Sequence, residues 1–110
     1  MLTLPGNARI FLWQTPVDMR KGFNGLAAEV ENRFGNEVTS GAFFAFLNRK
    51  RDRIKVLYWD GDGLVIWYKQ LEAGTFSCRQ NEPENPSRRE FLMLLEGVVP
   101  KRLKRRYKES

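Results

Sequence analysis

The stretch that decides the fold is residues 54–71, IKVLYWDGDGLVIWYKQL. Two runs in it, Ile54 to Asp60 and Leu64 to Leu71, are rich in β-branched and aromatic residues, as β-strands are. The tripeptide GDG at residues 61–63 separates them, and glycine and aspartate tolerate the positive φ angles of a tight turn. The stretch therefore predicts an antiparallel hairpin.

A turn at Gly61 and Asp62 fixes which side chains lie opposite each other in this hairpin. The pairs on one face are Trp59 with Leu64, Leu57 with Ile66 and Lys55 with Tyr68, and those on the other face are Tyr58 with Val65 and Val56 with Trp67. Both faces are largely apolar, so we expect the hairpin to be central in a sheet that is covered on two sides. Aromatic residues interleaved with cations could also form a platform for stacking bases, but we expect most of these aromatic residues to belong to the core, with one near the turn left exposed.

The segment before the hairpin predicts a strand, a helix and a second strand. The strands are Ala8 to Gln14 and Ala42 to Leu47, and the helix runs from Met19 to Phe34 with Asp18 as its N-cap. The apolar stripe that we expect to face the core consists of Phe23, Leu26, Ala27, Val30 and Phe34.

The segment after the hairpin predicts a short strand and a second helix. The strand is Thr75 to Arg79, and a polar linker that contains proline follows it. Ser87 and Glu90 have the spacing of a capping box, so we expect a helix to begin there. Gly97 and Pro100 are the residues expected to end it.

Together these elements predict an α+β fold, with a mostly antiparallel sheet of four to six strands, one packed helix and a short C-terminal helix. A chain of 110 residues, 42% of them hydrophobic and 13% aromatic, is long enough for one hydrophobic core. We therefore expect residues 1–100 to form a single globular domain and residues 101–110 to form a basic tail. No apolar run approaches the roughly 20 residues that span a bilayer, and we expect a cytoplasmic protein without membrane contact.

The chain lacks the residues that most enzymes and zinc sites use. It has no histidine and one cysteine, which removes the commonest general base, the usual zinc-ligand sets and an internal disulfide. The carboxylates of Asp52, Asp60, Asp62 and Glu72 are candidates for a magnesium site, but a hairpin turn selects aspartate in any case. We therefore expect no catalytic residue, no metal site and no cofactor, with metal-dependent catalysis as the weaker alternative.

The positive charge is concentrated at the C-terminus. The net charge is +6. Residues 1–100 contain 13 Lys or Arg and 12 Asp or Glu, whereas residues 101–110 contain 6 Lys or Arg and 1 Asp or Glu. Such a tail suggests contact with a polyanion, of which nucleic acid is the commonest in the cytoplasm. The tail residues expected to make this contact are Lys101, Arg102, Lys104, Arg105 and Arg106. The alternative is a disordered tail that only keeps the protein in solution.

Two further basic clusters precede the tail. Arg20 and Lys21 lie in the first turn of the expected helix, whose free amides favour an anion, although a salt bridge to Asp18 explains them equally well. Gly22 and Gly25 follow, each costing a helix about 1 kcal/mol relative to alanine. They indicate close approach of a strand, another chain or a phosphate backbone, and we expect close packing against the sheet.

The second cluster lies just before the hairpin. Arg49, Lys50, Arg51, Arg53 and Lys55 place five cations within seven residues. Arginine is well suited to bidentate phosphate contacts, so we expect this turn to grip a phosphate backbone. The alternative is a solvated loop with an internal counter-charge from its aspartate.

Two long motifs in this chain carry a resemblance to a known family. DMRKGFNGL at residues 18–26 and RDRIKVLYWDGDGLVIWYKQLEAGTF at residues 51–76 occur in the order found in the small TnpB accessory protein of insertion sequences of the sixty-six family. The resemblance extends from Leu4 to Gly97 and does not concern the RNA-guided nuclease of the same name. It implies a product of a bacterial mobile element, encoded beside a separate and longer transposase, that assists transposition without a known chemical activity.

From the clusters and the resemblance we expect a non-catalytic accessory factor that binds DNA, at the ends of the element, by contacts to phosphates. The transposase and the other accessory protein of the same element are its expected protein partners. No side-chain pattern predicts readout of bases, so a preference for the ends would come from DNA shape or from the transposase. The main alternative is a protein adaptor that supports transposase assembly without touching DNA, and a weaker one is an RNA-binding regulator.

Overall fold

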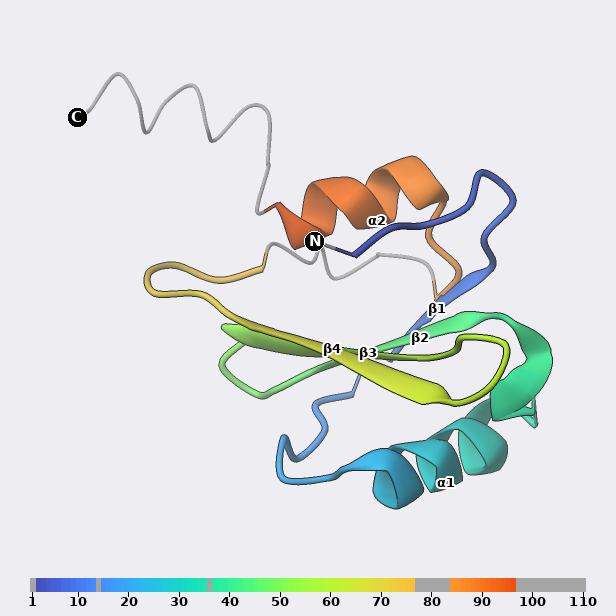
Figure 1. The fold of residues 1–110 in the computed structure, drawn as a ribbon. Helices are drawn as coiled ribbons and strands as arrows, with labels where there is room; N and C mark the ends of the chain where they lie inside the picture. The colour runs from blue at the N-terminus through green and yellow to red at the C-terminus, as the bar shows by residue number, and fades with distance from the viewer. Residues whose placement is uncertain (1, 14, 36, 77–83, 97–110) are drawn as a thin grey trace.

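The fold is α+β, as the sequence predicts, and a computed structural model describes it for residues 2–13, 15–35, 37–76 and 84–96 (Figure 1). A 3-10 turn at Val38–Ser40 separates the first helix from the second strand. In chain order the strands and α-helices are β1 (Ile10–Leu12), α1 (Phe23–Phe34), β2 (Phe43–Leu47), β3 (Arg53–Trp59), β4 (Leu64–Gln70) and α2 (Arg88–Leu95).

The strands form one sheet in the order β1-β2-β3-β4. β1 and β2 are parallel and α1 lies between them in the chain, because parallel neighbours require a crossover connection. The other two pairings are antiparallel, so the sheet is mostly antiparallel and the expected fold class is confirmed.

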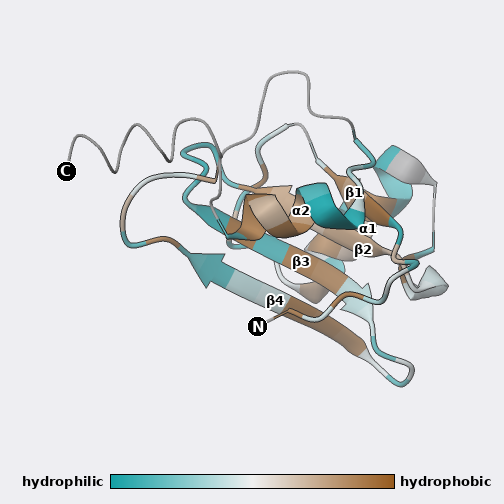
Figure 2. Cartoon of the chain, turned by 90° about the horizontal axis from the view of Figure 1, so that it is seen from above, coloured by the Kyte–Doolittle hydropathy of each residue, from teal (hydrophilic) through white to brown (hydrophobic). Residues whose placement is uncertain are grey.

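Each face of the sheet is covered by one helix (Figure 1). Leu26 and Val30 of α1 pack against one face, in a core with Phe44 and Leu57. On the other face α2 supplies the buried side chains of Phe91, Leu94 and Leu95, which join Ile54 and Val56. Figure 2 shows hydrophobic residues along the middle of the sheet and hydrophilic residues at strand ends. Alternate residues of one strand thus enter different cores.

The hairpin has the expected register. All five predicted pairs, from Trp59 opposite Leu64 to Lys55 opposite Tyr68, are present. Gly61 has φ 88° and the amide of Asp60 donates to the carbonyl of Gly63 at 2.9 Å, which closes the turn. The chemistry of the tight turn therefore determines the register of this part of the structure.

The expectation that the hairpin is central is correct for β3 and wrong for β4, which is an edge strand of the described sheet. After β4 the chain does not lie beside it. The amides of Leu71 and Phe76 donate to the carbonyls of Asp52 and Arg51, at 2.8 and 2.7 Å, so this segment folds onto the turn between β2 and β3. Thr75 and Phe76 are accordingly outside any strand, and residues 77–79 of the expected strand lie outside the described residues.

The expected start of the first helix is also wrong, because α1 begins at Phe23 with Gly22 as its N-cap. Asp18 instead holds a turn, in which its carbonyl accepts from the amide of Lys21 at 3.1 Å. The carbonyl of Met19, which a longer helix would need for its own ladder, accepts a hydrogen bond from the side chain of Lys55. A tertiary contact therefore competes successfully with the local helix signal.

The later start changes what faces the core. Leu26 and Val30 are buried as expected, but Phe23 is 48% exposed. Neither glycine is explained by close packing against the sheet. A Cβ at Gly22 would meet nothing within 4 Å, and the nearest atoms to a Cβ at Gly25 belong to the side chain of Lys21.

The outer elements differ from expectation mainly in length. The first strand is confined to Ile10–Leu12, while the second is nearly as predicted. α2 begins with the predicted capping box, in which Ser87 and Glu90 exchange side-chain and backbone hydrogen bonds. The predicted helix stop at Gly97 and Pro100 lies outside the described residues.

Replacing Phe44 by alanine tests the core beneath α1. Phe44 is fully buried and stacks on Phe11 at 5.4 Å between ring centroids. We expect Phe44→Ala to lower the free energy of unfolding by about 3–5 kcal/mol, because it leaves a cavity. The matched variant Phe23→Ala, at an exposed phenylalanine, should cost less than about 1 kcal/mol. Urea unfolding measures both, and equal losses would contradict the assignment of the core.

Candidate nucleic-acid interface

The turn between β2 and β3 is shaped by Asn48. Its Oδ1 accepts from the amides of Asp52 and Arg53 at 3.1 and 3.0 Å, and its Nδ2 donates to Oδ1 of Asp52 at 2.6 Å. Its carbonyl accepts from the amide of Arg51, which has φ 61° and so lies in the left-handed region that is unfavourable for most residues. These bonds hold the turn without using any of its cationic groups.

A second layer supports this turn from inside. Phe76, which is 1% exposed, anchors residues 71–76 in the core beneath α2, and its amide bonds to the carbonyl of Arg51. The carbonyl of Asp52 accepts from Leu71 in the same segment. The turn is therefore fixed by a buried anchor, and its exposed side chains lose little backbone freedom when they bind a ligand.

The loop before α1 is held beside the turn by the side chain of Lys55. Its Nζ donates to the carbonyls of Met19 and Lys21 at 2.7 and 2.9 Å, and Lys55 is only 9% exposed. The amide of Val17 donates to the carbonyl of Leu47 at the end of β2. These bonds tie the loop to β2 and β3.

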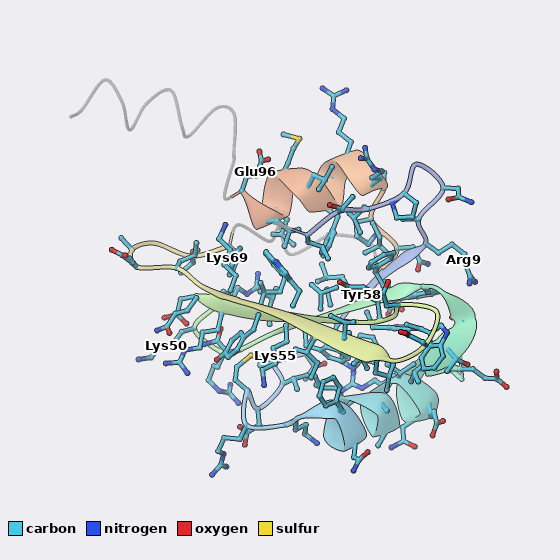
Figure 3. The ribbon with its side chains drawn as sticks, in the orientation of Figure 1. Arg9, Lys50, Lys55, Tyr58, Lys69 and Glu96 are labelled. Atoms are coloured by element: carbon cyan, nitrogen blue, oxygen red, sulfur yellow. The ribbon has the colours of Figure 1, made fainter. Side chains whose placement is uncertain are left out.

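Between this loop and the turn lies a cleft of about 640 Å³. Residues 16–20 form one wall, and the other is formed by Asn48, Arg49, Lys50, Asp52 and Arg53. Figure 3 shows Lys50 and Lys55 at the same end of the sheet, away from Arg9. The fold thus joins the first residue of the early basic cluster to three residues of the later one, although the two clusters are far apart in sequence.

The charge of the cleft is positive. The cleft has two carboxylates. That of Asp18 pairs with the guanidinium of Arg20, and that of Asp52 accepts a hydrogen bond from the side-chain amide of Asn48. Arg49 and Lys50 are exposed, and the described part of the chain supplies no ion pair to them. Arg53 is half-buried and likewise has no ion pair there. Four cations against two engaged carboxylates leave a surface that attracts anions.

Asp18 and Arg20 form the salt bridge that the sequence leaves open as an alternative. The Arg20 side chain donates at 2.8 to 3.2 Å, its amide donates at 2.8 Å, and these hydrogen bonds lower the pKa of Asp18 from 3.8 to about 2. The same contact raises the pKa of Arg20. The Arg20 side chain is 91% exposed, so the pair lies on the surface with the guanidinium accessible from solution.

The predicted binding residues divide into three groups. Arg20, Arg49, Lys50 and Arg53 line the cleft. Lys21 forms an ion pair with Glu29 at 3.4 Å. The backbone of Arg51 forms hydrogen bonds that stabilise the turn. Lys55 is buried and its Nζ makes structural hydrogen bonds, so it is not available to a ligand. The tail residues Lys101, Arg102, Lys104, Arg105 and Arg106 lie outside the described residues.

Sequence reasoning missed two features of this region. It assigned no role to Asn48, whose position before a basic turn is the available signal. It also placed the exposed aromatic residue near the hairpin turn, where Tyr58 and Trp59 are in fact half-buried. The exposed one is Tyr68, at 48%, near the other end of β4. The sequence signal for this exposure is the predicted pairing of Tyr68 with a charged residue, Lys55.

The described ranges contain neither a membrane-spanning helix nor a cluster of metal ligands. They contain no helix long and apolar enough to cross a membrane. In the same ranges no three His, Cys, Asp or Glu side chains are grouped so that they could hold a metal ion, and the carboxylates considered for magnesium are therefore not brought together there.

Sequence comparison finds relatives of this chain. Residues 8–105 match the profile of the family described as "IS66 Orf2 like protein". The chain is 35% identical over 100 residues to "Uncharacterized protein y4jC" of Sinorhizobium fredii (strain NBRC 101917 / NGR234), covering 89% of this chain and 86% of that protein. It is 33% identical over 76 residues to "Uncharacterized protein y4hO" of the same strain, covering 69% and 66% of the two chains. No solved structure matches significantly.

The pKa of Asp18 tests the salt bridge in the cleft wall. Because the folded-state pKa is about 2 and the ordinary value is 3.8, the stabilising effect is complete above pH 3.8 and is lost as the pH falls towards 2. In Arg20→Gln the pKa should return towards 3.8, whereas Lys21→Gln should move it less, since Lys21 is the smallest of the causes. NMR titration of the carboxyl group measures each value, and an unchanged pKa in Arg20→Gln would contradict the pairing.

Lys55→Met tests the structural role of the buried lysine. The variant leaves the carbonyls of Met19 and Lys21 without their donor. We expect it to lower the free energy of unfolding by about 1–3 kcal/mol. Lys50→Met, at an exposed position, is the control and should change stability little. Equal stability of the two variants in urea unfolding would show that Lys55 does not hold the loop.

Proposed function

The chain belongs to the IS66 Orf2-like family, and from that premise we propose that it is a DNA-binding accessory factor that contacts phosphates through the cleft between residues 16–20 and 48–53. The family match confirms the resemblance carried by the two sequence motifs. The family has an accessory role in the transposition of insertion sequences and is not a known enzyme family. The DNA contact and its location on the molecule are the proposed part.

The observation that carries the proposal is the convergence of Arg20, Arg49, Lys50 and Arg53 on one cleft. These residues come from two segments that are tied together by hydrogen bonds from Lys55 and Val17. A solvated loop does not need such bracing, whereas a phosphate site benefits from it because less freedom is lost on binding.

The chemistry of the cleft fits a phosphate backbone. Guanidinium groups donate two parallel hydrogen bonds to phosphate oxygens, and three of the four cations are arginines. Arg49 and Lys50 extend from the tip of a turn whose backbone is already fixed, where a nucleic acid can reach them. Contacts of this kind hold DNA in register without reading its sequence.

The basic tail and the proteins of the same element complete the proposal. The tail cations would add affinity on any DNA sequence, because each phosphate contact releases counterions. The transposase and the other accessory protein are the proposed partners that would direct the bound protein to the element ends.

Titration of labelled duplex DNA with the full chain at several salt concentrations tests the proposal. One duplex carries the terminal repeats of the element and the other a scrambled sequence. Arg49→Gln should weaken binding to both duplexes and lower the slope of log affinity against log salt by about 1, as the loss of one phosphate contact predicts. Arg89→Gln is the matched control, because Arg89 is an exposed arginine on α2, which covers the opposite face of the sheet from α1 (Figure 1).

A further variant separates the cleft from the tail. In it the tail residues Lys101, Arg102, Lys104, Arg105 and Arg106 are all replaced by glutamine. Salt-sensitive binding that survives this change, and then falls on Arg49→Gln, supports the cleft as the site. Equal effects of Arg49→Gln and Arg89→Gln would contradict the cleft. If the full chain binds neither these duplexes nor single-stranded DNA at low salt, direct DNA binding is wrong and an adaptor that touches only proteins replaces it.

A further inference from the structure

An exposed aromatic ring lies beside the cleft. Tyr68 is 48% exposed, although most aromatic residues of the described sheet are buried or half-buried. It faces Lys55 across the β3–β4 pair, and Nζ of Lys55 lies 4.8 Å from the centroid of its ring. A cation over the ring holds it in place through the negative face of the π system.

The same lysine connects the ring to the cleft. Nζ of Lys55 is 2.7 Å from the carbonyl of Met19, a residue of the cleft wall. Its other acceptor is the carbonyl of Lys21, two residues before Phe23. Tyr68 and Phe23, each 48% exposed, are the exposed large hydrophobic residues of the described chain. Of the two, Tyr68 directly contacts the side chain that braces the cleft.

The two sides of the Tyr68 ring differ. Lys55 is 9% exposed and covers one side, so the exposed area of Tyr68 belongs to its outer side and edge. A flat apolar surface that is open to solvent, and is connected through Lys55 to the cleft whose cations we propose bind phosphates, supplies the two components that single-stranded nucleic acid requires. These are a stacking surface and an electrostatic track. Duplex DNA cannot use the stacking surface, because its bases are already stacked and paired.

We propose that Tyr68 stacks on an unpaired base of single-stranded DNA while the adjoining backbone phosphates lie in the cleft. This inference rests on the proposed function and specifies its substrate as a single strand. The ring contributes affinity for any base, since every base offers a π face, and the arginines contribute the salt dependence.

The experiment compares the full chain with Tyr68→Thr and Tyr68→Phe. Threonine keeps a strand-forming residue while removing the ring, and phenylalanine keeps the ring. Each protein is titrated into a labelled single strand of DNA, the same strand with abasic positions, the corresponding RNA and the duplex. Thermal unfolding of the three proteins confirms that the sheet is intact.

We expect Tyr68→Thr to bind the single strand about tenfold more weakly, the size of one lost stacking contact. Its binding to duplex should change less than twofold, and Tyr68→Phe should behave as the unaltered protein. Abasic positions should weaken binding by the unaltered protein and have no further effect on Tyr68→Thr, because the same contact is already missing.

Three results would overturn the inference while leaving the proposed function intact. They are binding of duplex without binding of the single strand, an equal loss of both on Tyr68→Thr, and an abasic effect that persists in Tyr68→Thr. Binding of the RNA more than tenfold tighter than the DNA would overturn the assignment of DNA as the ligand. Failure to bind any nucleic acid would instead reject the proposed function, and the inference with it.

Discussion

The hydrogen bonds from Lys55 to the carbonyls of Met19 and Lys21 are the constraint on which this end of the molecule depends. Lysine on a central strand must find partners for its Nζ, because a buried polar group without them is costly. The two carbonyls supply these partners, and they thereby fix the path of the loop before α1. The Lys55 side chain thus affects three features of this region. They are the start of α1, the position of Arg20 in the loop and the contact that supports the Tyr68 ring.

The basic turn separates structural residues from exposed cations. The side chain of Asn48 accepts hydrogen bonds from two backbone amides of the turn and is itself oriented by the carboxylate of Asp52, while Arg49 and Lys50 at the tip take no part in these bonds. The unfavourable φ of Arg51 is held by bonds from both sides, through Asn48 and through Phe76. Substitution of Arg49 or Lys50 should therefore remove charge and leave the turn conformation intact. Substitution of Asn48 should disrupt the turn conformation and leave its charge unchanged.

The position of β4 at the edge of the described sheet gives the hairpin a mixed character. Its central residues contribute to both cores, whereas its end near the cleft leaves Tyr68 open to solvent. On a strand that is paired on both sides and covered by helices on both faces, an aromatic side chain would be buried. The edge position is therefore what allows an aromatic residue of the core hairpin to serve at a surface.

The sequence by itself determined the hairpin with its register, the capping box at Ser87, the fold class and the residue types of the basic clusters. These depend on nearest neighbours in the chain, on turn residues and on the residue types of each segment, so local physics is sufficient for them. Tertiary structure decided where α1 begins, that β4 is an edge strand, and which cations share a cleft. Each of these depends on contacts between distant segments, such as Lys55 with Met19 and Phe76 with Arg51, whose free energies exceed the local preferences. No pattern along the chain records them.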